Sequence, residues 1–162
     1  MDRGVERVID SEVTVPAPIA EVWEAWTTEG GARTFFAPQC RIELRPGGAY
    51  EMLFDLAAEP GKQGGEGMIV LAIDPQRMLS FTWNAPPSLP AVRAQMTHVV
   101  VRLSETGTGD THVTLRHDGW GTGGEWDAAF DYFSRAWSGV VLPRLKYRFA
   151  HGPVDWSDPP GR

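Results

Sequence analysis

Two alternating segments on either side of a polar turn constrain the fold more than any other feature of the sequence. Residues 95–104 and 111–117 flank the turn at 106–110, and they predict an antiparallel hairpin, in which opposed residues share a face. A turn centred on Thr108 pairs Leu103 with Val113, Val101 with Leu115 and Val99 with His117, whereas Ser104–His112, Arg102–Thr114 and Val100–Arg116 form a mostly polar face. A slip of one residue would mix the two faces. We therefore expect His117 to point to the buried, concave side at the end of an apolar row.

Turn residues divide the preceding part of the chain into further short strands. Clusters of proline and glycine mark the breaks. The segments 50–55, 67–73 and 78–84 between these breaks predict an antiparallel meander. A first strand over 5–15 ends at Pro16 and is expected at an edge of the sheet.

Helical periodicity predicts two short helices over 18–36, separated by a glycine pair, and one long helix over 125–149. In the long helix, apolar residues recur every three or four positions. Pro143 lies inside it and removes one backbone donor, so we expect a bend near Gly139. The apolar rhythm continues beyond the proline, which argues against a break. The residues expected to face the sheet are Phe133, Trp137 and Val141.

The size of the chain favours one domain. With 162 residues, of which 42% are hydrophobic, it can bury a core without disulfides or metal. We expect a single domain over 1–162, with a core at about 5–150. The segment 151–162 contains three prolines and is expected to be a loosely ordered tail.

Charge, cysteine content and missing motifs narrow the classes of partner. The formal net charge is −6 and the basic residues are scattered, which argues against nucleic acid and against an anionic membrane surface. The single Cys40 excludes an internal disulfide, and neither a signal peptide nor a stretch of about 18 apolar residues occurs, so we expect a cytoplasmic protein. His112 and His117 point to opposite faces, so the histidines do not converge on a metal ion. The sequence contains no serine-hydrolase elbow, zincin helix or phosphate-binding loop, and no cofactor is expected.

Several segments occur in an order that a known family shares. They are Val15-Pro-Ala-Pro-Ile-Ala-Glu-Val-Trp-Glu-Ala-Trp26, Phe35-Phe36-Ala-Pro38, Arg45-Pro-Gly-Gly48, Ile73-Asp-Pro-Gln-Arg77 followed by Leu79-Ser-Phe-Thr-Trp83, and Thr114-Leu-Arg-His-Asp-Gly-Trp120. Over residues 5 to 150 or so, the chain resembles START-like (SRPBCC, birch-pollen-allergen-like) domains. Within them it is similar to the bacterial heat-shock-protein-90 ATPase activator homologue family.

The resemblance implies an α+β helix-grip fold. In this fold a curved antiparallel sheet of about six or seven strands wraps around a long C-terminal helix, two short helices follow strand 1, and a cavity opens near them. Members of the superfamily bind lipids, hormones or polyketides, and some are cyclases or hydrolases, so the fold does not fix the function. Eukaryotic activators carry a separate N-terminal domain that contacts the chaperone. A chain of 162 residues leaves no room for that domain, and chaperone contact is not expected.

Aromatic and apolar residues on the expected inner faces form the candidate ligand site, with ordinary core as the alternative for each. Tyr50, Met52 and Phe54 share one strand face, and Trp83 lies on the apolar parity of its own strand. Tyr50 and Trp83 can each place a polar group in apolar surroundings, as a ligand site requires. The candidate ligand-binding residues are Tyr50, Met52, Phe54, Trp83, His117, Phe133, Trp137 and Val141.

Three functions fit these observations. The leading hypothesis is a non-catalytic protein that encloses a small, mostly apolar or aromatic molecule. The first alternative is a cyclase- or hydrolase-type enzyme that uses His117 as acid or base in the same cavity, although no nucleophile or carboxylate is visibly placed beside this residue. The second alternative is a chaperone-interacting module, which relies on the family resemblance alone. A homodimer is left open.

Overall fold

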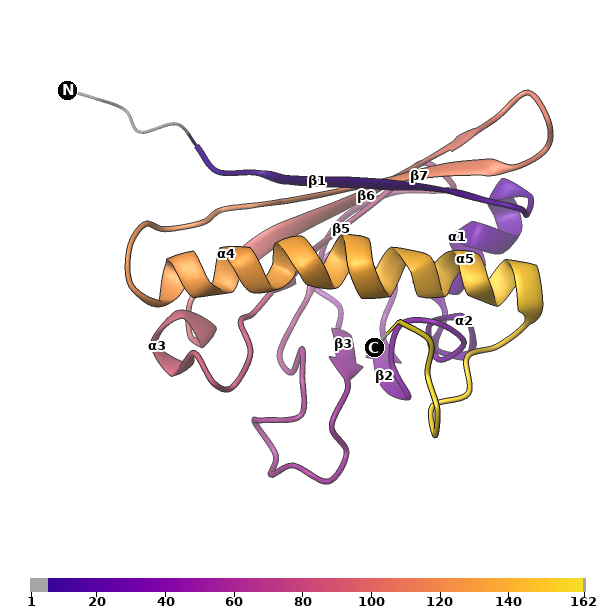
Figure 1. Cartoon of the computed structure of the whole chain (residues 1–162). Coiled ribbons are helices and arrows are strands. Elements are labelled where there is room, and N and C mark those ends of the chain that lie inside the picture. Colours follow the sequence, from indigo (N-terminus) through magenta and orange to yellow (C-terminus); the bar gives the residue numbers. More distant parts are fainter. Residues whose placement is uncertain (1–5, 162) are drawn as a thin grey trace.

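An antiparallel sheet of five strands lies against one long helix (Figure 1). The structure is a computed structural model that describes residues 6–161. Its strands are β1 (Ile9–Val15), β2 (Gln39–Ile42), β3 (Tyr50–Leu53), β4 (Val70–Asp74), β5 (Met78–Trp83), β6 (Thr97–Glu105) and β7 (Thr111–Asp118). Its helical segments are α1 (Ile19–Thr27), α2 (Glu29–Ala32), α3 (Pro90–Arg93), α4 (Glu125–Ala136), η1 (Trp137–Val141) and α5 (Leu142–His151). This order confirms the α+β architecture expected from the sequence, while Val5 of the expected first strand lies outside the described residues.

The hairpin register predicted from the sequence is confirmed pair by pair. β6 and β7 pair Leu103 with Val113, Val101 with Leu115, and Val99 with His117. The large sheet has the order β1-β7-β6-β5-β4, so β7 lies between β6 and the edge strand β1. His117 is completely buried, as its place at the end of the inward apolar row predicts.

A second, two-stranded sheet formed by β2 and β3 continues the wall beyond β4. Ala49 and Ile69 form an isolated antiparallel bridge, and the Tyr50 amide donates to the Met68 carbonyl at 2.8 Å. These contacts join the small sheet to the large one. The two sheets together contain seven strands, which agrees with the expected six or seven. Neither β2 nor α3 was among the predicted elements, because each has only four residues and shows no period of its own.

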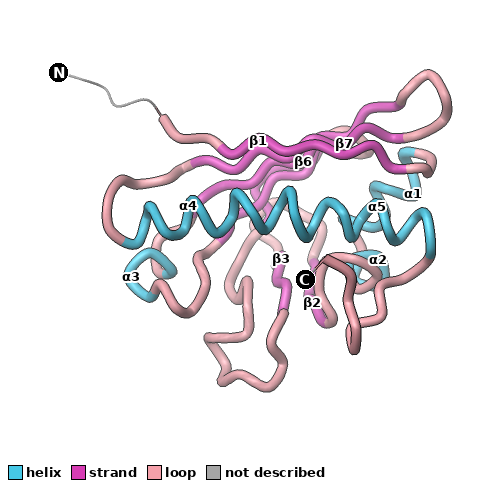
Figure 2. The backbone as a smooth tube through the Cα atoms, in the orientation of Figure 1, coloured by secondary structure: helices cyan, strands magenta, loops and turns pink. Residues whose placement is uncertain are grey.

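The long helix runs without a break from α4 through η1 into α5 (Figure 2). The bend expected near Gly139 is instead a turn of π-helix at Trp137–Val141, in which the Leu142 amide donates to the Trp137 carbonyl five residues back. In a regular α-helix the Pro143 ring would crowd the carbonyl of Gly139, and its missing N–H would leave that carbonyl without a donor. The wider turn accommodates the proline without a sharp kink.

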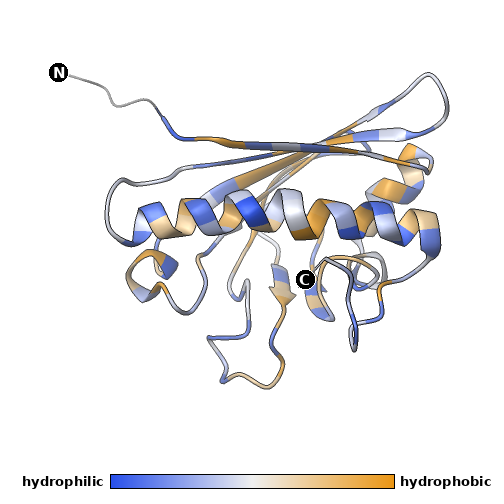
Figure 3. Ribbon diagram, viewed as in Figure 1, coloured by the Kyte–Doolittle hydropathy of each residue, from blue (hydrophilic) through white to orange (hydrophobic). Residues whose placement is uncertain are grey.

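Large aromatic side chains fill the core between the sheet, the short helices and the long helix. Figure 3 shows hydrophobic and hydrophilic residues alternating along the long helix, as an amphipathic helix requires. The Trp26 ring meets Phe35 edge-on, with ring centroids 5.0 Å apart, and Phe36 contacts Trp137 at 6.0 Å. Phe36, which follows α2, thereby connects this aromatic cluster to the middle of the long helix.

Residues 152–161, in the segment expected from its prolines to be a loosely ordered tail, make hydrogen bonds to the rest of the chain. The Val154 amide donates to the Thr34 carbonyl at 2.8 Å, and the Trp156 indole donates to the Arg33 carbonyl at 2.6 Å. Farther along, the Pro160 carbonyl accepts from Arg144 Nε at 2.8 Å. The buried Val154 side chain and these bonds hold the segment against α2 and α5.

Within the described part of the chain, no helix combines the length and the apolar character needed to cross a membrane.

Candidate functional site

A pocket of about 380 Å³ opens between the long helix, the end of β5 and the loop of residues 54–69 that joins β3 to β4. This volume falls in the usual range for small-molecule sites, about 300–1,000 Å³. Proline, glycine and a few polar side chains form part of its rim. The aromatic residues that line it are Phe36, Phe54, Trp83, Tyr132, Phe133 and Trp137.

The structure places most of the predicted ligand-binding residues at this pocket. Phe133, Trp137 and Val141 reach it from the long helix, and Trp83 reaches it from the end of β5. Phe54 lies just beyond β3, where its half-exposed ring forms part of the outer wall. Tyr50, Met52 and His117 do not line the pocket.

Tyr50 and Met52 point inward, as predicted, but they lie deeper than the pocket. Both side chains are completely buried. The Tyr50 hydroxyl donates to the Trp26 carbonyl at 2.8 Å, and its ring stacks on Phe81 with centroids 4.3 Å apart. Burial raises the pKa of the Tyr50 hydroxyl well above its ordinary value. These two residues therefore belong to the core rather than to the lining of the pocket.

His117 is the centre of a buried hydrogen-bond chain behind the pocket wall. The Trp137 indole donates to His117 Nδ1 at 2.9 Å, and His117 Nε2 lies 2.6 Å from Thr97 Oγ1. Since an indole N–H can only donate, Nδ1 must accept and the imidazole proton must sit on Nε2. The Thr97 hydroxyl in turn donates a hydrogen bond to the Trp83 carbonyl at 3.1 Å.

This arrangement gives His117 a structural role. Burial, with a smaller contribution from His98, lowers the pKa of His117 to about 3, so the ring is neutral at neutral pH. Both ring nitrogens have partners, and neither is directed to the pocket. The geometry therefore does not favour the acid–base role considered for His117, because its ring does not reach the pocket. Thr97 was missed by sequence reasoning, although its place two residues before Val99 on the inward row was a readable signal.

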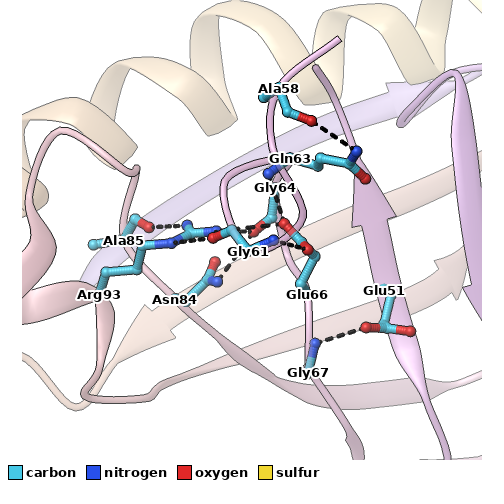
Figure 4. A network of polar contacts seen from close by, with 10 residues as sticks. All are labelled: Glu51, Ala58, Gly61, Gln63, Gly64, Glu66, Gly67, Asn84, Ala85 and Arg93. Atoms are coloured by element: carbon cyan, nitrogen blue, oxygen red, sulfur yellow. Dashed lines mark hydrogen bonds and ion pairs between the residues drawn. The ribbon is translucent and has the colours of Figure 1, made fainter. Parts of the chain in front are cut away.

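The outer wall of the pocket is held by a residue that the sequence did not reveal. Arg93 of α3 donates through Nη1 to the Ala85 carbonyl at 2.6 Å and through Nη2 to the carbonyls of Gly61 and Gly64, each at 2.8 Å (Figure 4). Its Nη2 also lies 3.8 Å from the Glu66 carboxylate. Burial lowers the pKa of Arg93 from its ordinary value, and Glu66 opposes that shift.

Glu66 and Asn84 complete the network around Arg93. The Glu66 carboxylate accepts from the Gly61 and Gln63 amides, and Asn84 Nδ2 donates to the Gly64 carbonyl at 3.1 Å (Figure 4). One guanidinium thus ties the β3–β4 loop to α3 and to the segment after β5. The groups that accept from Arg93 are backbone carbonyls, and every residue has one. The amino-acid sequence therefore does not indicate which residues contact Arg93.

No group of three or more His, Cys, Asp and Glu side chains within residues 6–161 is placed to hold a metal ion.

Comparison with known families identifies the chain. Residues 16–149 match the model of the family described as "Activator of Hsp90 ATPase homolog 1-like protein" (AHSA1). The chain belongs to this family. The resemblance seen in the sequence is thereby confirmed, and the helix-grip fold is that of the AHSA1 family.

Solved structures of several other proteins share this fold. The Aha1 dimer from Colwellia psychrerythraea superposes with a TM-score of 0.69 at 18% identity, covering 90% of this chain and 98% of that one. CalU16 from Micromonospora echinospora gives 0.59 at 24% identity, covering 97% and 70%. DynU16, a putative protein of the dynemicin biosynthetic locus, gives 0.67 at 20% identity. The match covers 92% of the AHSA1 chain described here but only 49% of DynU16, so this chain spans about half the length of that protein. A search among curated proteins finds no match.

Proposed function

We propose that this chain binds a small, mostly apolar or aromatic molecule in the pocket between the long helix and the β3–β4 loop. The observation that carries the proposal is the convergence of aromatic rings from four separate parts of the chain around a space of about 380 Å³. Filled cores leave no void of this size. The family fold is typically that of a ligand-binding domain, which supports the proposal.

The rings around the pocket are already arranged to receive a flat molecule. Trp83 and Trp137 have centroids 5.6 Å apart, and Phe133 stacks on Trp137 at 6.2 Å. The Trp137 ring is held in place by its bond to His117. A preformed wall of this kind lowers the ordering cost of binding. The hydrogen-bond chain through His117 therefore serves the site by fixing one of its walls.

Filling the pocket from the helix side is expected to abolish binding. Val141 lines the pocket from the π turn, so the indole of Val141→Trp would occupy the space that a ligand needs. N-phenyl-1-naphthylamine, whose fluorescence rises in apolar surroundings, should bind the native protein at one saturable site. We expect Val141→Trp to weaken that binding at least about tenfold, which corresponds to 1.4 kcal/mol.

Ser138 offers a matched control in the same helical turn, because it is exposed. Ser138→Trp adds the same indole to the outer side of the helix and should leave probe affinity unchanged. Native far-ultraviolet circular dichroism of both variants shows that the fold is intact. Probe binding that is equal in native protein and folded Val141→Trp would contradict the proposal.

A further inference from the structure

Two polar groups in the pocket wall lack a partner within residues 6–161. Asn84 is only 7% exposed and uses its amide nitrogen for the Gly64 carbonyl, while its Oδ1 accepts no hydrogen bond from the described residues. Trp83 is only 3% exposed, and its indole N–H has no acceptor among them. Both residues line the pocket. A donor or acceptor removed from water without a partner destabilises the folded protein, so a ligand that supplies the missing partner is favoured.

Neither of these two groups is fully sealed in the core. The Trp26 N–H is the one fully enclosed side-chain donor or acceptor without a partner in the described part of the chain. Trp83 Nε1 and Asn84 Oδ1 therefore retain some accessible surface. Because both residues line the pocket, we infer that this surface faces it.

The orientation of the Asn84 amide is set by the network around Arg93. The Gly64 carbonyl accepts from Asn84 Nδ2 at 3.1 Å and from Arg93 Nη2 at 2.8 Å (Figure 4). A carbonyl can only accept, so it selects the nitrogen end of the amide and leaves Oδ1 on the other side. Arg93 holds the Gly64 carbonyl in place through its further bond to Ala85. The acceptor that Asn84 presents is therefore preorganised.

We propose that the pocket recognises an aromatic molecule that carries a hydroxyl group. The Trp83 N–H donates to the hydroxyl oxygen, and Asn84 Oδ1 accepts the hydroxyl proton. A hydroxyl is the simplest single group that both accepts and donates. A carboxylate would leave Asn84 Oδ1 facing another acceptor, and an ammonium would leave the Trp83 N–H facing another donor. This inference rests on the proposed function and adds the chemical class of the ligand.

The charged residues at the pocket already have partners within the protein, so they do not favour an anionic ligand. Lys62 Nζ lies 3.7 Å from the Glu59 carboxylate, and Arg93 lies 3.8 Å from that of Glu66. Arg144 donates to the Pro160 carbonyl and packs over the ring of Trp156. The one acidic lining residue, Asp55, accepts from the Ala57 amide. A neutral aromatic hydroxyl compound meets this wall without an uncompensated charge.

Three related probes separate the hydroxyl contacts from ring burial. 2-Naphthol can accept from Trp83 and donate to Asn84, 2-methoxynaphthalene can only accept, and naphthalene can do neither. Titrated into the native protein in competition with N-phenyl-1-naphthylamine, 2-naphthol should bind about tenfold more tightly than naphthalene, because each hydrogen bond adds a modest gain. 2-Methoxynaphthalene should fall between them.

A variant assigns the second contact to Asn84. Asn84→Leu has nearly the same size but no acceptor, and it should remove the advantage of 2-naphthol over 2-methoxynaphthalene. Its affinity for naphthalene should stay native, which shows that the pocket is intact. Gln95→Leu is the matched control, because Gln95 is an exposed amide that does not line the pocket. That change should leave the preference for 2-naphthol unaltered.

The ranking of the probes in the native protein requires no variant to fold. Equal affinities for 2-naphthol and naphthalene would overturn the inference, and so would a preference for 2-naphthol over 2-methoxynaphthalene that persists in Asn84→Leu. In both outcomes the aromatic probes still bind, and the proposed function stands. If neither N-phenyl-1-naphthylamine nor any of the three probes binds, the proposed function itself fails.

Discussion

Replacing Trp137 with alanine is expected to lower the free energy of unfolding by about 3–5 kcal/mol, the range for a large buried aromatic. The sequence alone favours a smaller loss, because helical spacing places Trp137 at an open pocket. In the structure the residue lines the pocket but is only 1% exposed. Its ring contacts Phe36, Trp83 and Phe133, and its N–H donates to His117 Nδ1.

Urea denaturation followed by circular dichroism measures this loss. Trp137→Phe separates its two causes, since it keeps a ring but leaves His117 Nδ1 unpaired, at a cost of about 1–3 kcal/mol. Trp156→Ala is the control, because Trp156 is only half-buried and lies in the C-terminal segment. It should cost clearly less than Trp137→Ala. A loss for Trp137→Ala no larger than that of the control would show that the ring is not part of the core.

Acidification is expected to destabilise the protein through His117 by roughly 1.4 kcal/mol for each pH unit between about 6.5 and 3. Burial lowers the pKa of this histidine from 6.5 to about 3 in the folded protein. Between those values the unfolded chain binds one more proton than the native one, so stability falls as the pH falls. Above pH 6.5 the imidazole is neutral in both states and contributes no slope.

Other groups also titrate in this range, so the test is a comparison of variants. His117→Gln removes the titrating ring, and its stability should fall less steeply between pH 6.5 and pH 4 than that of the native protein, although it is less stable at pH 7. His112→Gln is the control, because His112 lies on the outer face beside Glu12. It should retain the native slope. Parallel curves for native protein and His117→Gln would contradict the burial of a neutral imidazole.

The hairpin and the long helix could be predicted because side-chain periodicity encodes them directly. The separation of apolar from polar residues across β6 and β7 allows only one register, and it places His117 inward. Alternation along a strand shows, however, only which face of the sheet a residue lies on. It does not show how deeply the residue is buried. Tyr50, Met52 and Phe54 share a parity, yet the first two are core and the third is a half-exposed residue of the pocket wall, because β3 ends at Leu53.

The remaining parts of the site depend on contacts that leave no periodic pattern. Arg93 is one of fifteen Lys and Arg residues, and only the folded backbone shows that the carbonyls of Gly61, Gly64 and Ala85 converge on it. The π turn at Trp137–Val141 follows from Pro143, but the sequence does not distinguish a wider turn from a kink. Asn84 follows the last residue of β5. A single amide after a strand does not indicate a binding role until its hydrogen bond to the Gly64 carbonyl is known.

The central claim is that an aromatic ligand enters the pocket between the long helix and the β3–β4 loop. The most direct test is a ¹⁵N-edited NMR titration of the native protein with N-phenyl-1-naphthylamine, observing the indole N–H signals of assigned tryptophans. Trp83 and Trp137 line the pocket, whereas Trp156 lies in the C-terminal segment against α2. We predict saturable shifts of the Trp83 and Trp137 signals with little change at Trp156. Saturable binding that leaves the Trp83 and Trp137 signals unmoved would contradict the account.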